Sequence, residues 1–333
     1  MAGAKPAVLV AGGAGYIGSH TAKALRHAGF EPVTLDNLVT GNRCAVRFGP
    51  FVEGSIADRP LVEKTVREFG IEAAILFAAH AYVGESTAHP AKYYRNNVGA
   101  SIDFLDGLMA AGVKTLVFSS SCSIYGAQTD DAPISESAPK NPLSPYAETK
   151  LFLESALGWY ERAYGLRSVC LRYFNAAGCD PDWEIGECHD PETHLIPLAI
   201  AAAMGGAPLR ILGDDYPTPD GTAVRDYVHV TDLGDAHVSA LGHLLGGRPS
   251  DRFNCGTGTG HSVRQVIEAV KGVSGKGVPF EVGPRRAGDA PVLVADATRI
   301  REVLQWEPRH SSLETICATA WRWYSERSLR HAR

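Results

Sequence analysis

Short apolar runs alternate with longer amphipathic stretches along the first half of the chain. The run AVLVA at residues 7–11 is followed at once by glycines, as expected for a strand that is buried on both faces of a parallel sheet. By the same reasoning we expect strands at 32–36, 73–78, 115–118 and 168–173, and helices at 16–27, directly after Asp58, at 91–111 and at 144–164. This alternation is typical of βαβ units, so we predict an α/β fold with a doubly wound parallel sheet, the Rossmann architecture.

The regular alternation ends after Asn175. Two stretches rich in Asp, Pro and Gly, at 179–192 and 213–221, separate shorter apolar segments, and loops of this kind commonly carry binding function. We therefore expect a first domain over residues 1–175, to which 226–250 return, and a smaller, interleaved C-terminal α/β domain over 176–225 and 251–333.

Composition excludes several classes of protein. The 333 residues are 45% hydrophobic and 21% charged, which is ordinary for a globular protein. The net charge of −5, with no run of Lys or Arg, argues against nucleic acid as a partner. Glycines interrupt the short apolar stretch at the N-terminus, which predicts neither a signal peptide nor a membrane-spanning helix. We expect a cytoplasmic protein without a membrane partner.

The seven cysteines are scattered and include no Cys-x-x-Cys pair, which is typical of individually placed, reduced thiols. Cys179, Cys188 and His189 share one loop, but no fourth ligand follows at a spacing typical of zinc sites. From the sequence we therefore expect no metal site.

A glycine-rich turn follows the first expected strand and opens the first expected helix. Gly12, Gly15 and Gly18 have the spacing Gly-x-x-Gly-x-x-Gly. Glycines at such a turn let the backbone approach a pyrophosphate closely, while the N–H groups at the start of the helix point toward the anion. This position in a βαβ unit predicts a dinucleotide-binding site.

An acidic residue, Asp36, ends the second expected strand. A carboxylate at this place accepts hydrogen bonds from the ribose of adenosine and repels a 2′-phosphate. The next residue is Asn37 rather than an arginine, although Arg43 lies nearby in the sequence. We therefore predict NAD rather than NADP as the cofactor.

A tyrosine and a lysine lie four residues apart, at Tyr146 and Lys150, on the helix expected to begin at 144, so their side chains emerge from one face. A lysine ammonium near a phenol favours the phenolate, and this lowers a pKa that starts near 10 and suits the phenol to act as a general base. Ser121 closes the preceding expected strand, where its hydroxyl can share the proton of a substrate oxygen. We interpret these three residues, beside a dinucleotide motif, as the catalytic group.

These motifs resemble the extended short-chain dehydrogenases/reductases and, more narrowly, the UDP-glucose 4-epimerases, across nearly the whole chain. The matching segments include AGGAGYIGSH, LDNLVTGN, FAAHAYVGES, SSSCSIYG, SPYAETK, LRYFNAAG, THLIP and DGTAVRDYVHVTDL. The resemblance implies an isomerase of carbohydrate metabolism that interconverts UDP-glucose and UDP-galactose through a transient 4-keto sugar, with NAD regenerated in each cycle. It also implies a homodimer, with NAD bound by the first domain and the UDP-sugar by the second.

The resemblance also assigns individual residues to the two ligands. We expect NAD to contact Gly12, Gly15, Tyr16, Ile17, Gly18, Asp36, Asn37, Leu38, Ser55, Ile56, Phe77, Ala78, Ala79, Asn96, Ser119, Tyr146, Lys150, Tyr173 and Phe174. We expect the UDP-sugar to contact Ser121, Tyr146, Asn175, His194, Leu195, Arg225, Arg286, Asp289 and Leu293. The two arginines would neutralise the diphosphate. The chain departs from the usual pattern at Ala11, Ser55 and Ala81, and the first two of these changes affect cofactor affinity more than chemistry.

The range of sugars depends on Leu293, which falls where relatives place a residue bordering the sugar pocket. A tyrosine there is associated with rejecting N-acetylated sugars, and leucine is smaller, so we expect weak turnover of UDP-N-acetylhexosamines. The other interpretation is that Leu293 is a core residue of the apolar run at 292–294. Discrimination by pocket volume alone is worth only about 1–3 kcal/mol.

Three alternative functions remain open at this point. The resemblance is compatible with a UDP-xylose/UDP-arabinose 4-epimerase. A sugar-nucleotide dehydratase would carry an Asp-Glu pair after Ser121, but Cys122 and Ser123 stand there and offer no carboxylate. A non-catalytic, NAD-sensing regulator on the same fold would characteristically lack the tyrosine or the lysine, and both are present.

Overall fold

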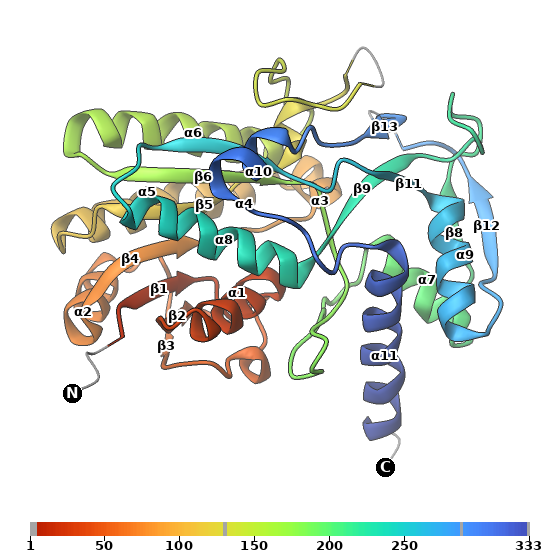
Figure 1. The fold of residues 1–333 in the computed structure, drawn as a ribbon, viewed down its shortest axis with the longest axis horizontal. Helices are drawn as coiled ribbons and strands as arrows, with labels where there is room; N and C mark the ends of the chain where they lie inside the picture. Colours follow the sequence, from red (N-terminus) through yellow and green to blue (C-terminus); the bar gives the residue numbers. More distant parts are fainter. Residues whose placement is uncertain (1–4, 129–131, 287–288, 332–333) are drawn as a thin grey trace.

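A seven-stranded, fully parallel sheet forms the larger part of the molecule (Figure 1). The structure is a computed structural model and describes residues 5–128, 132–286 and 289–331. Across the sheet the strands follow in the order β10 (Asp251–Cys255), β6 (Arg167–Tyr173), β5 (Thr115–Ser119), β4 (Ile71–Leu76), β1 (Ala7–Ala11), β2 (Glu31–Asp36) and β3 (Phe51–Glu53). The predicted doubly wound α/β fold is confirmed.

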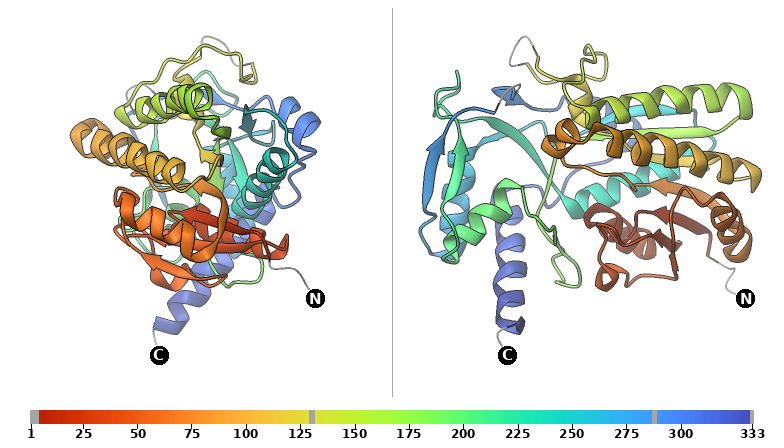
Figure 2. Two further views of the ribbon diagram at one scale, coloured as in Figure 1. Left: turned by 90° about the vertical axis from the view of Figure 1, so that its left-hand side faces the viewer. Right: turned by 180° about the vertical axis from the view of Figure 1, so that it is seen from behind.

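Helices cover both faces of this sheet because successive residues of each strand point to opposite faces. In β1, Leu9 belongs to the core on one face and Val10 to the core on the other, and both are fully buried. The first face is covered by α2 (Arg59–Phe69), α5 (Ala100–Ala110) and α6 (Pro145–Tyr164), and the second by α1 (Tyr16–His27), α8 (Val230–Leu245) and α10 (Thr298–Leu304). Figure 2 shows these two helical layers with the sheet between them.

A smaller α/β region lies at one end of the large sheet (Figure 2). Its strands are β7 (Asn175–Ala177), β9 (Val224–His229), β11 (Gly260–Ser262) and β13 (Val292–Leu293), with the separate parallel pair β8 (Leu209–Leu212) and β12 (Phe280–Gly283). Its helices are α7 (Leu195–Ala203), α9 (Val263–Ser274) and α11 (Leu313–His331), which share one apolar core. No helix in the described part of the chain is long and apolar enough to cross a membrane.

The expected helix at 91–111 is divided in the structure. It consists of α4 (Pro90–Tyr93), a π-helical segment η2 (Tyr94–Gly99) and α5. Within the π-helical segment the amide of Asn97 accepts a hydrogen bond from the backbone N–H of His80 at 2.8 Å and donates to the carbonyl oxygen of His80 at 3.0 Å. Such wide turns often occur at functional sites, and this one ties the helix to the loop that follows β4.

Two further differences from the sequence-based expectation concern strands. The strand expected at 73–78 runs from Ile71 to Leu76, which leaves Phe77 and Ala78 outside the strand, although the N–H groups of both residues donate to the carbonyl of Ala11. Residues 251–255, expected in the smaller domain, form the edge strand β10 of the large sheet, because they pair with β6. The division of the chain into an NAD-binding and a UDP-sugar-binding domain stays a proposal.

The remaining short elements connect the layers. They are α3 (Val83–Ala88), η1 (Arg43–Ala45) and η3 (Cys122–Tyr125).

Candidate active site

A cavity of ≈ 700 Å³ opens at the carboxyl ends of the parallel strands, the usual place for a ligand in an open α/β sheet. Its wall is formed by the turn between β1 and α1, by the ends of β2, β5 and β6, by the first turn of α6, by the loop at 178–194 and by α11. The cavity therefore lies between the large sheet and the smaller region.

The glycine turn is closely packed, and side chains would not fit there. Gly12 has a φ of +83°, and a Cβ atom on it would lie 2.5 Å from the backbone nitrogen of Ala78. A Cβ atom on Gly18 would collide with the carbonyl oxygen of Gly12. Helix α1 begins with Gly15 as its N-cap, and no side chain caps its first N–H groups. These donors border the cavity, which suits an anionic group such as a pyrophosphate.

Asp36 lies at the end of β2 on the cavity wall and is 8% exposed. Its carboxylate accepts hydrogen bonds from the backbone N–H groups of Ala14 and Leu38, both at 2.9 Å. Burial raises the pKa of Asp36, and these two hydrogen bonds counteract that rise. No lysine or arginine in the described residues forms an ion pair with Asp36. The carboxylate is therefore held in place with its charge directed at the cavity.

Tyr146 and Lys150 both line the cavity from the first turns of α6, as the spacing predicts. The helix starts where Ser144 accepts a hydrogen bond from the N–H of Ala147 at 3.2 Å. The Lys150 ammonium donates to the carbonyl oxygen of Ser119 at 2.7 Å and lies 5.8 Å from the centre of the Tyr146 ring. The position of the catalytic pair follows from the N-cap of α6 and the end of β5.

Ser121 completes this group, because it lines the same cavity and its hydroxyl lowers the pKa of the Tyr146 phenol. Its hydroxyl also accepts hydrogen bonds from the backbone N–H and the hydroxyl of Ser123, at 3.2 Å and 2.9 Å. Ser121 therefore lies between the phenol and a fixed donor, a suitable arrangement for sharing a proton.

Burial dominates the ionisation of Tyr146 and Lys150, the two residues predicted to be catalytic. Desolvation raises the pKa of Tyr146 to about 12, although the hydrogen bond with Ser121 lowers it. Desolvation lowers the pKa of Lys150 to about 7. The expectation that Lys150 lowers the pKa of Tyr146 is therefore wrong for the protein by itself, because loss of solvent raises that pKa.

Most of the residues that the sequence assigned to ligands meet at this cavity. Those that line it are Gly12, Gly15, Tyr16, Ile17, Gly18, Asp36, Asn37, Ser55, Ile56, Phe77, Ala78, Ala79, Asn96, Ser119, Ser121, Tyr146, Lys150, Tyr173, Phe174, Asn175 and His194. The assigned residues outside the cavity lining are Leu38, Leu195, Arg225, Arg286, Asp289 and Leu293. The assignments of individual contacts stay predictions.

The residues outside the lining have other neighbours in the protein. Arg225 forms an ion pair with Asp289 at 2.5 Å, so each charge is satisfied by the other. Arg286 is exposed. Leu195 begins α7 and packs against the core of the smaller region, and Leu293 packs against an apolar cluster that includes Phe174. Leu293 is thus connected to the cavity through a residue of its wall.

The sequence analysis did not predict part of the cavity wall. Trp183 and Glu184 from the loop at 178–194, and Trp323 from α11, line the cavity. The loop is held by a hydrogen bond from the Tyr16 hydroxyl to the carbonyl of Gly178 at 2.5 Å. The only signal for this wall was the irregular composition of the loop, which indicates binding but does not identify the contacting residues.

Four ionisable side chains of the same loop gather beside the cavity. Glu187, His189, Glu192 and His194 bring one ligand atom each to within 4.8 Å of the others. Burial alone would lower the pKa of His194, but the two carboxylates overcome this effect and raise it to about 10. Within the loop, His194 thus faces Glu187 and Glu192.

Comparison with known proteins places the chain in a family. The profile of the NAD dependent epimerase/dehydratase family matches residues 8–256. A UDP-glucose 4-epimerase from Streptococcus mutans is 47% identical over 323 residues, which cover 96% of this chain and 97% of that protein. The crystal structure of UDP-glucose 4-epimerase from Brucella ovis in complex with NAD has a TM-score of 0.93 and 50% identity, and the match covers 96% of this chain and 98% of that one.

A further solved structure is similar over the full length. It is a UDP-glucose 4-epimerase from Stenotrophomonas maltophila with bound NAD and formylated UDP-arabinopyranose, with a TM-score of 0.94, 38% identity, and coverage of 99% of this chain and 100% of that chain. The resemblance inferred from the motifs is confirmed. The chain belongs to the NAD-dependent epimerase/dehydratase family and, within it, to the UDP-glucose 4-epimerases.

Proposed function

We propose that this protein interconverts UDP-glucose and UDP-galactose by inverting the C4 hydroxyl, with NAD as its cofactor. The observation that supports this proposal most directly is the meeting of Tyr146, Lys150 and Ser121 at the same cavity as the glycine turn. Proton-transfer groups thus lie beside a place shaped for a dinucleotide. The activity agrees with the names of the relatives described above.

The residues present fit NAD. The uncapped N–H groups at the start of α1, which border the cavity, suit the pyrophosphate. The fixed Asp36 carboxylate suits the adenosine ribose and disfavours a 2′-phosphate. When bound, NAD supplies hydride acceptance from C4 of the sugar and hydride return to the opposite face.

The protein residues carry the proton. In the proposed reaction the Tyr146 phenol exchanges a proton with the sugar 4-hydroxyl, and Ser121 shares it through its hydrogen bond. Because burial raises the pKa of Tyr146 to about 12, the phenolate needs a nearby positive charge. Lys150 provides one such charge when protonated, and a cationic nicotinamide ring would provide another.

Two other reactions on this fold fit the site less well. A dehydratase needs an acid beside the serine, whereas the following side chains are those of Cys122 and Ser123, and Ser123 donates to Ser121. A regulator without activity needs neither the tyrosine nor the lysine, yet both line the cavity. In the proposed mechanism, epimerisation uses Ser121, Tyr146 and Lys150.

Several finer features belong to the proposal. We propose a homodimer through the outer face of α6, where Phe152, Trp159 and Tyr164 are 52%, 64% and 56% exposed. The reduced state of the cysteines, which form no disulfide in the described residues, fits a cytoplasmic location. UDP-xylose and UDP-arabinose are the main alternative substrate pair, and Leu293→Tyr should abolish the weak turnover of UDP-N-acetylhexosamines.

The test is incubation of the purified protein, without added NAD, with a panel of UDP-sugars, followed by identification of the products. We expect strong interconversion of UDP-glucose and UDP-galactose. Tyr146→Phe should lower turnover by about three orders of magnitude or more, because it removes the proton acceptor. Tyr160→Phe is the matched control, since Tyr160 lies on the same helix and binds Asp106 at 2.7 Å. Absence of C4 epimers, or normal turnover by Tyr146→Phe, would refute the proposal.

A further inference from the structure

We propose that Glu187, His189, Glu192 and His194 form a binding site for one divalent transition-metal ion of the zinc class. These residues lie on the loop at 178–194, on the wall of the cavity. The proposal does not depend on the epimerase reaction. It departs from the expectation drawn from the sequence, where only Cys179, Cys188 and His189 were considered as ligands.

The separations of the ligand atoms match those around a single metal ion. The Glu187 Oε1 atom lies 3.2 Å from His189 Nδ1 and 3.0 Å from His194 Nδ1. The carboxylate of Glu192 lies 2.9 Å from His194 Nδ1 and 3.6 Å from His189 Nδ1. With bonds of about 2.0–2.1 Å, two ligands of a tetrahedral zinc ion are about 3.3 Å apart. The 2.9 Å distance is to Oε1 of Glu192 and the 3.6 Å distance is to its Oε2. One ligand atom from each of the four residues lies within 4.8 Å of the other three, so these four atoms can share one central ion.

Glu187 points into this cluster and forms ion pairs with His189 and His194, but its Oε1 atom makes no hydrogen bond of good geometry. Its side chain is 3% exposed. Buried carboxylate oxygens are almost always hydrogen-bonded or coordinated to metal. The His189 Nδ1 atom is also buried without a hydrogen bond. Two converging buried atoms thus lie in an ion pair without a well-formed hydrogen bond, and a metal ion between them would bind both.

The charge of the cluster complements a divalent cation. In the metal-free protein the two carboxylates raise the pKa of both imidazoles and so favour their protonated form. A metal ion would displace these protons, and the two carboxylates and two neutral imidazoles would then carry a formal charge of −2. No lysine or arginine of the described residues forms an ion pair with these four side chains. A second acidic group nearby differs in this respect. Asp180, Asp182 and Glu184 surround the Lys23 ammonium at 2.8–2.9 Å, so that cation already occupies their centre.

The donor set also indicates which ions bind. Two imidazole nitrogens and two carboxylate oxygens suit zinc and its neighbours in the first transition row, whereas magnesium and calcium prefer oxygen ligands alone. His194 has a side chain that is 48% exposed, which provides a path for entry of the ion. The Glu192 carboxylate also accepts hydrogen bonds from the backbone N–H groups of Thr193 and His194, at 2.7 Å and 2.9 Å, and these bonds orient it.

A metal ion here would fasten the cavity wall to α11. The backbone carbonyl of Glu187 accepts a hydrogen bond from the Trp323 indole at 3.0 Å, and the Tyr324 hydroxyl lies 3.5 Å from Glu192. The ligand residues are thus joined to the C-terminal helix as well as to one another. Binding should therefore stabilise the loop and the helix together.

The test is zinc titration of the tag-free protein with its cofactor in place, after EDTA treatment and removal of the EDTA. Isothermal titration calorimetry and elemental analysis should give one zinc ion per chain, with a Kd below 10 μM. Cobalt(II) in place of zinc should give the intense visible absorption of a tetrahedral site. Zinc should raise the thermal midpoint of wild type by about 3 °C or more.

Glu187→Gln and His189→Gln should each weaken zinc binding at least 100-fold and abolish the thermal shift. Glu187→Gln is nearly isosteric, so this variant should fold as wild type does by circular dichroism. Asp182→Asn is the control and should bind zinc normally, since Lys23 occupies that group. Failure of wild type to bind zinc below 10 μM, or undiminished binding in Glu187→Gln, would overturn the proposal.

Discussion

Lys150 and Glu154 lie one turn apart on α6, and each is almost completely buried, at 3% and 2% exposure, but their surroundings differ sharply. Glu154 accepts hydrogen bonds from the Arg172 guanidinium at 2.9 Å and 2.6 Å and from the Ser120 hydroxyl at 2.6 Å. Lys150 donates to the carbonyl of Ser119, and no carboxylate of the described residues forms an ion pair with it.

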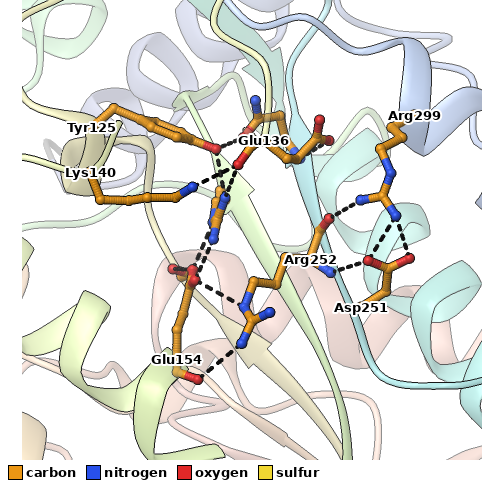
Figure 3. Close-up of polar contacts among 10 residues, drawn as sticks. Tyr125, Glu136, Lys140, Glu154, Asp251, Arg252 and Arg299 are labelled. Carbon is orange, nitrogen blue, oxygen red and sulfur yellow. Dashed lines mark hydrogen bonds and ion pairs between the residues drawn. The ribbon is translucent and has the colours of Figure 1, made fainter. Parts of the chain in front are cut away.

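The partners of Glu154 belong to a larger network beside α6 (Figure 3). Arg172 also donates to the hydroxyl of Tyr125 at 2.8 Å, and Arg252 lies 3.4 Å from Glu154. Burial would lower the pKa of Arg172, but Glu154 outweighs this effect and raises the pKa above its usual range. In this network each buried charge has an opposite charge or a hydrogen-bond partner, which is the arrangement expected where a charge supports the fold.

The two buried charges at the cavity differ from those of this network in one respect. The ammonium of Lys150 and the carboxylate of Asp36 have hydrogen-bond partners, but within the described residues neither forms an ion pair. A buried charge without an ion-pair partner lowers stability, and proteins retain such groups where a ligand will meet them. The contrast therefore separates Glu154 and Arg172, which support the fold, from Lys150 and Asp36, which we propose to bind ligands.

The largest expected effect is the loss of stability when the buried ion pair of Arg172 and Glu154 is broken. Arg172→Met leaves the Glu154 carboxylate without its main partner, so we expect the free energy of unfolding to fall by about 3–5 kcal/mol. Denaturant unfolding monitored by circular dichroism measures this loss. Arg299→Met removes an ion pair with Asp251 whose arginine is 43% exposed, and it should change stability by less than about 1 kcal/mol. The double variant Arg172→Met/Glu154→Leu should recover most of the loss, and a fully additive result would contradict the pairing.

The second largest effect is an increase in the free energy of unfolding. Lys150→Met removes a buried cation without a carboxylate partner, so in cofactor-free protein at pH 7 the free energy of unfolding should rise, by at most about 5 kcal/mol. The same variant should lose about 100-fold or more of its epimerase activity. Lys271→Met, on the surface of α9, should change neither quantity appreciably. A destabilised Lys150→Met protein would show that this charge supports the fold after all.

The stability contribution of Lys150 should also depend on pH. Burial lowers the pKa of Lys150 from 10.5 to about 7, so between these values the unfolded chain binds more protons at this residue than the folded protein does. This residue therefore makes stability rise as pH increases from 7 to 10.5 and contributes no slope below 7. We expect the stability advantage of Lys150→Met to be largest near pH 6 and to shrink toward pH 10. An advantage independent of pH would mean that it arises from packing rather than from charge.

The smallest expected effect concerns Asp36, a buried carboxylate that has only N–H partners. Asp36→Ala removes the charge that faces a 2′-phosphate, so the preference for NAD over NADP should fall by about 1–3 kcal/mol, or roughly 5- to 150-fold in relative affinity. Competition binding of both cofactors to cofactor-free protein measures this ratio. Asp182→Asn serves as the control, because Asp182 pairs with Lys23 away from the glycine turn. NADP in the wild-type protein as purified would contradict the interpretation of Asp36.

Local sequence patterns were sufficient to predict those helices and strands that have their own periodicity and capping residues. The run at 7–11 and the helix at 16–27 occur as β1 and α1, and Ser144 begins α6 as its N-cap. The glycine turn and the Tyr146–Lys150 pair were found for the same reason, since each depends on residues close together in the sequence.

Features that depend on distant partners could not be found in this way. Strands β8 and β12 have four residues each and exist through pairing with one another across about 70 positions. The π-helical segment depends on contacts of Asn97 with His80. The high pKa of Tyr146 results from burial, which spacing along α6 does not reveal. The Arg225–Asp289 ion pair likewise appears only once β9 is in place beside the segment at 289–293.

The cavity wall includes the glycine turn at 12–18 and Arg322, Trp323 and Glu326 of α11. The wall is therefore complete only when two segments about 300 residues apart in the sequence are both present. On a ribosome that adds about 5–20 residues per second, α11 is made roughly 15–60 s after the glycine turn. During that interval the emerging sheet can fold and display its nucleotide-binding edge while one wall is missing. Firm retention of the dinucleotide is thus a late event in the biosynthesis of this protein.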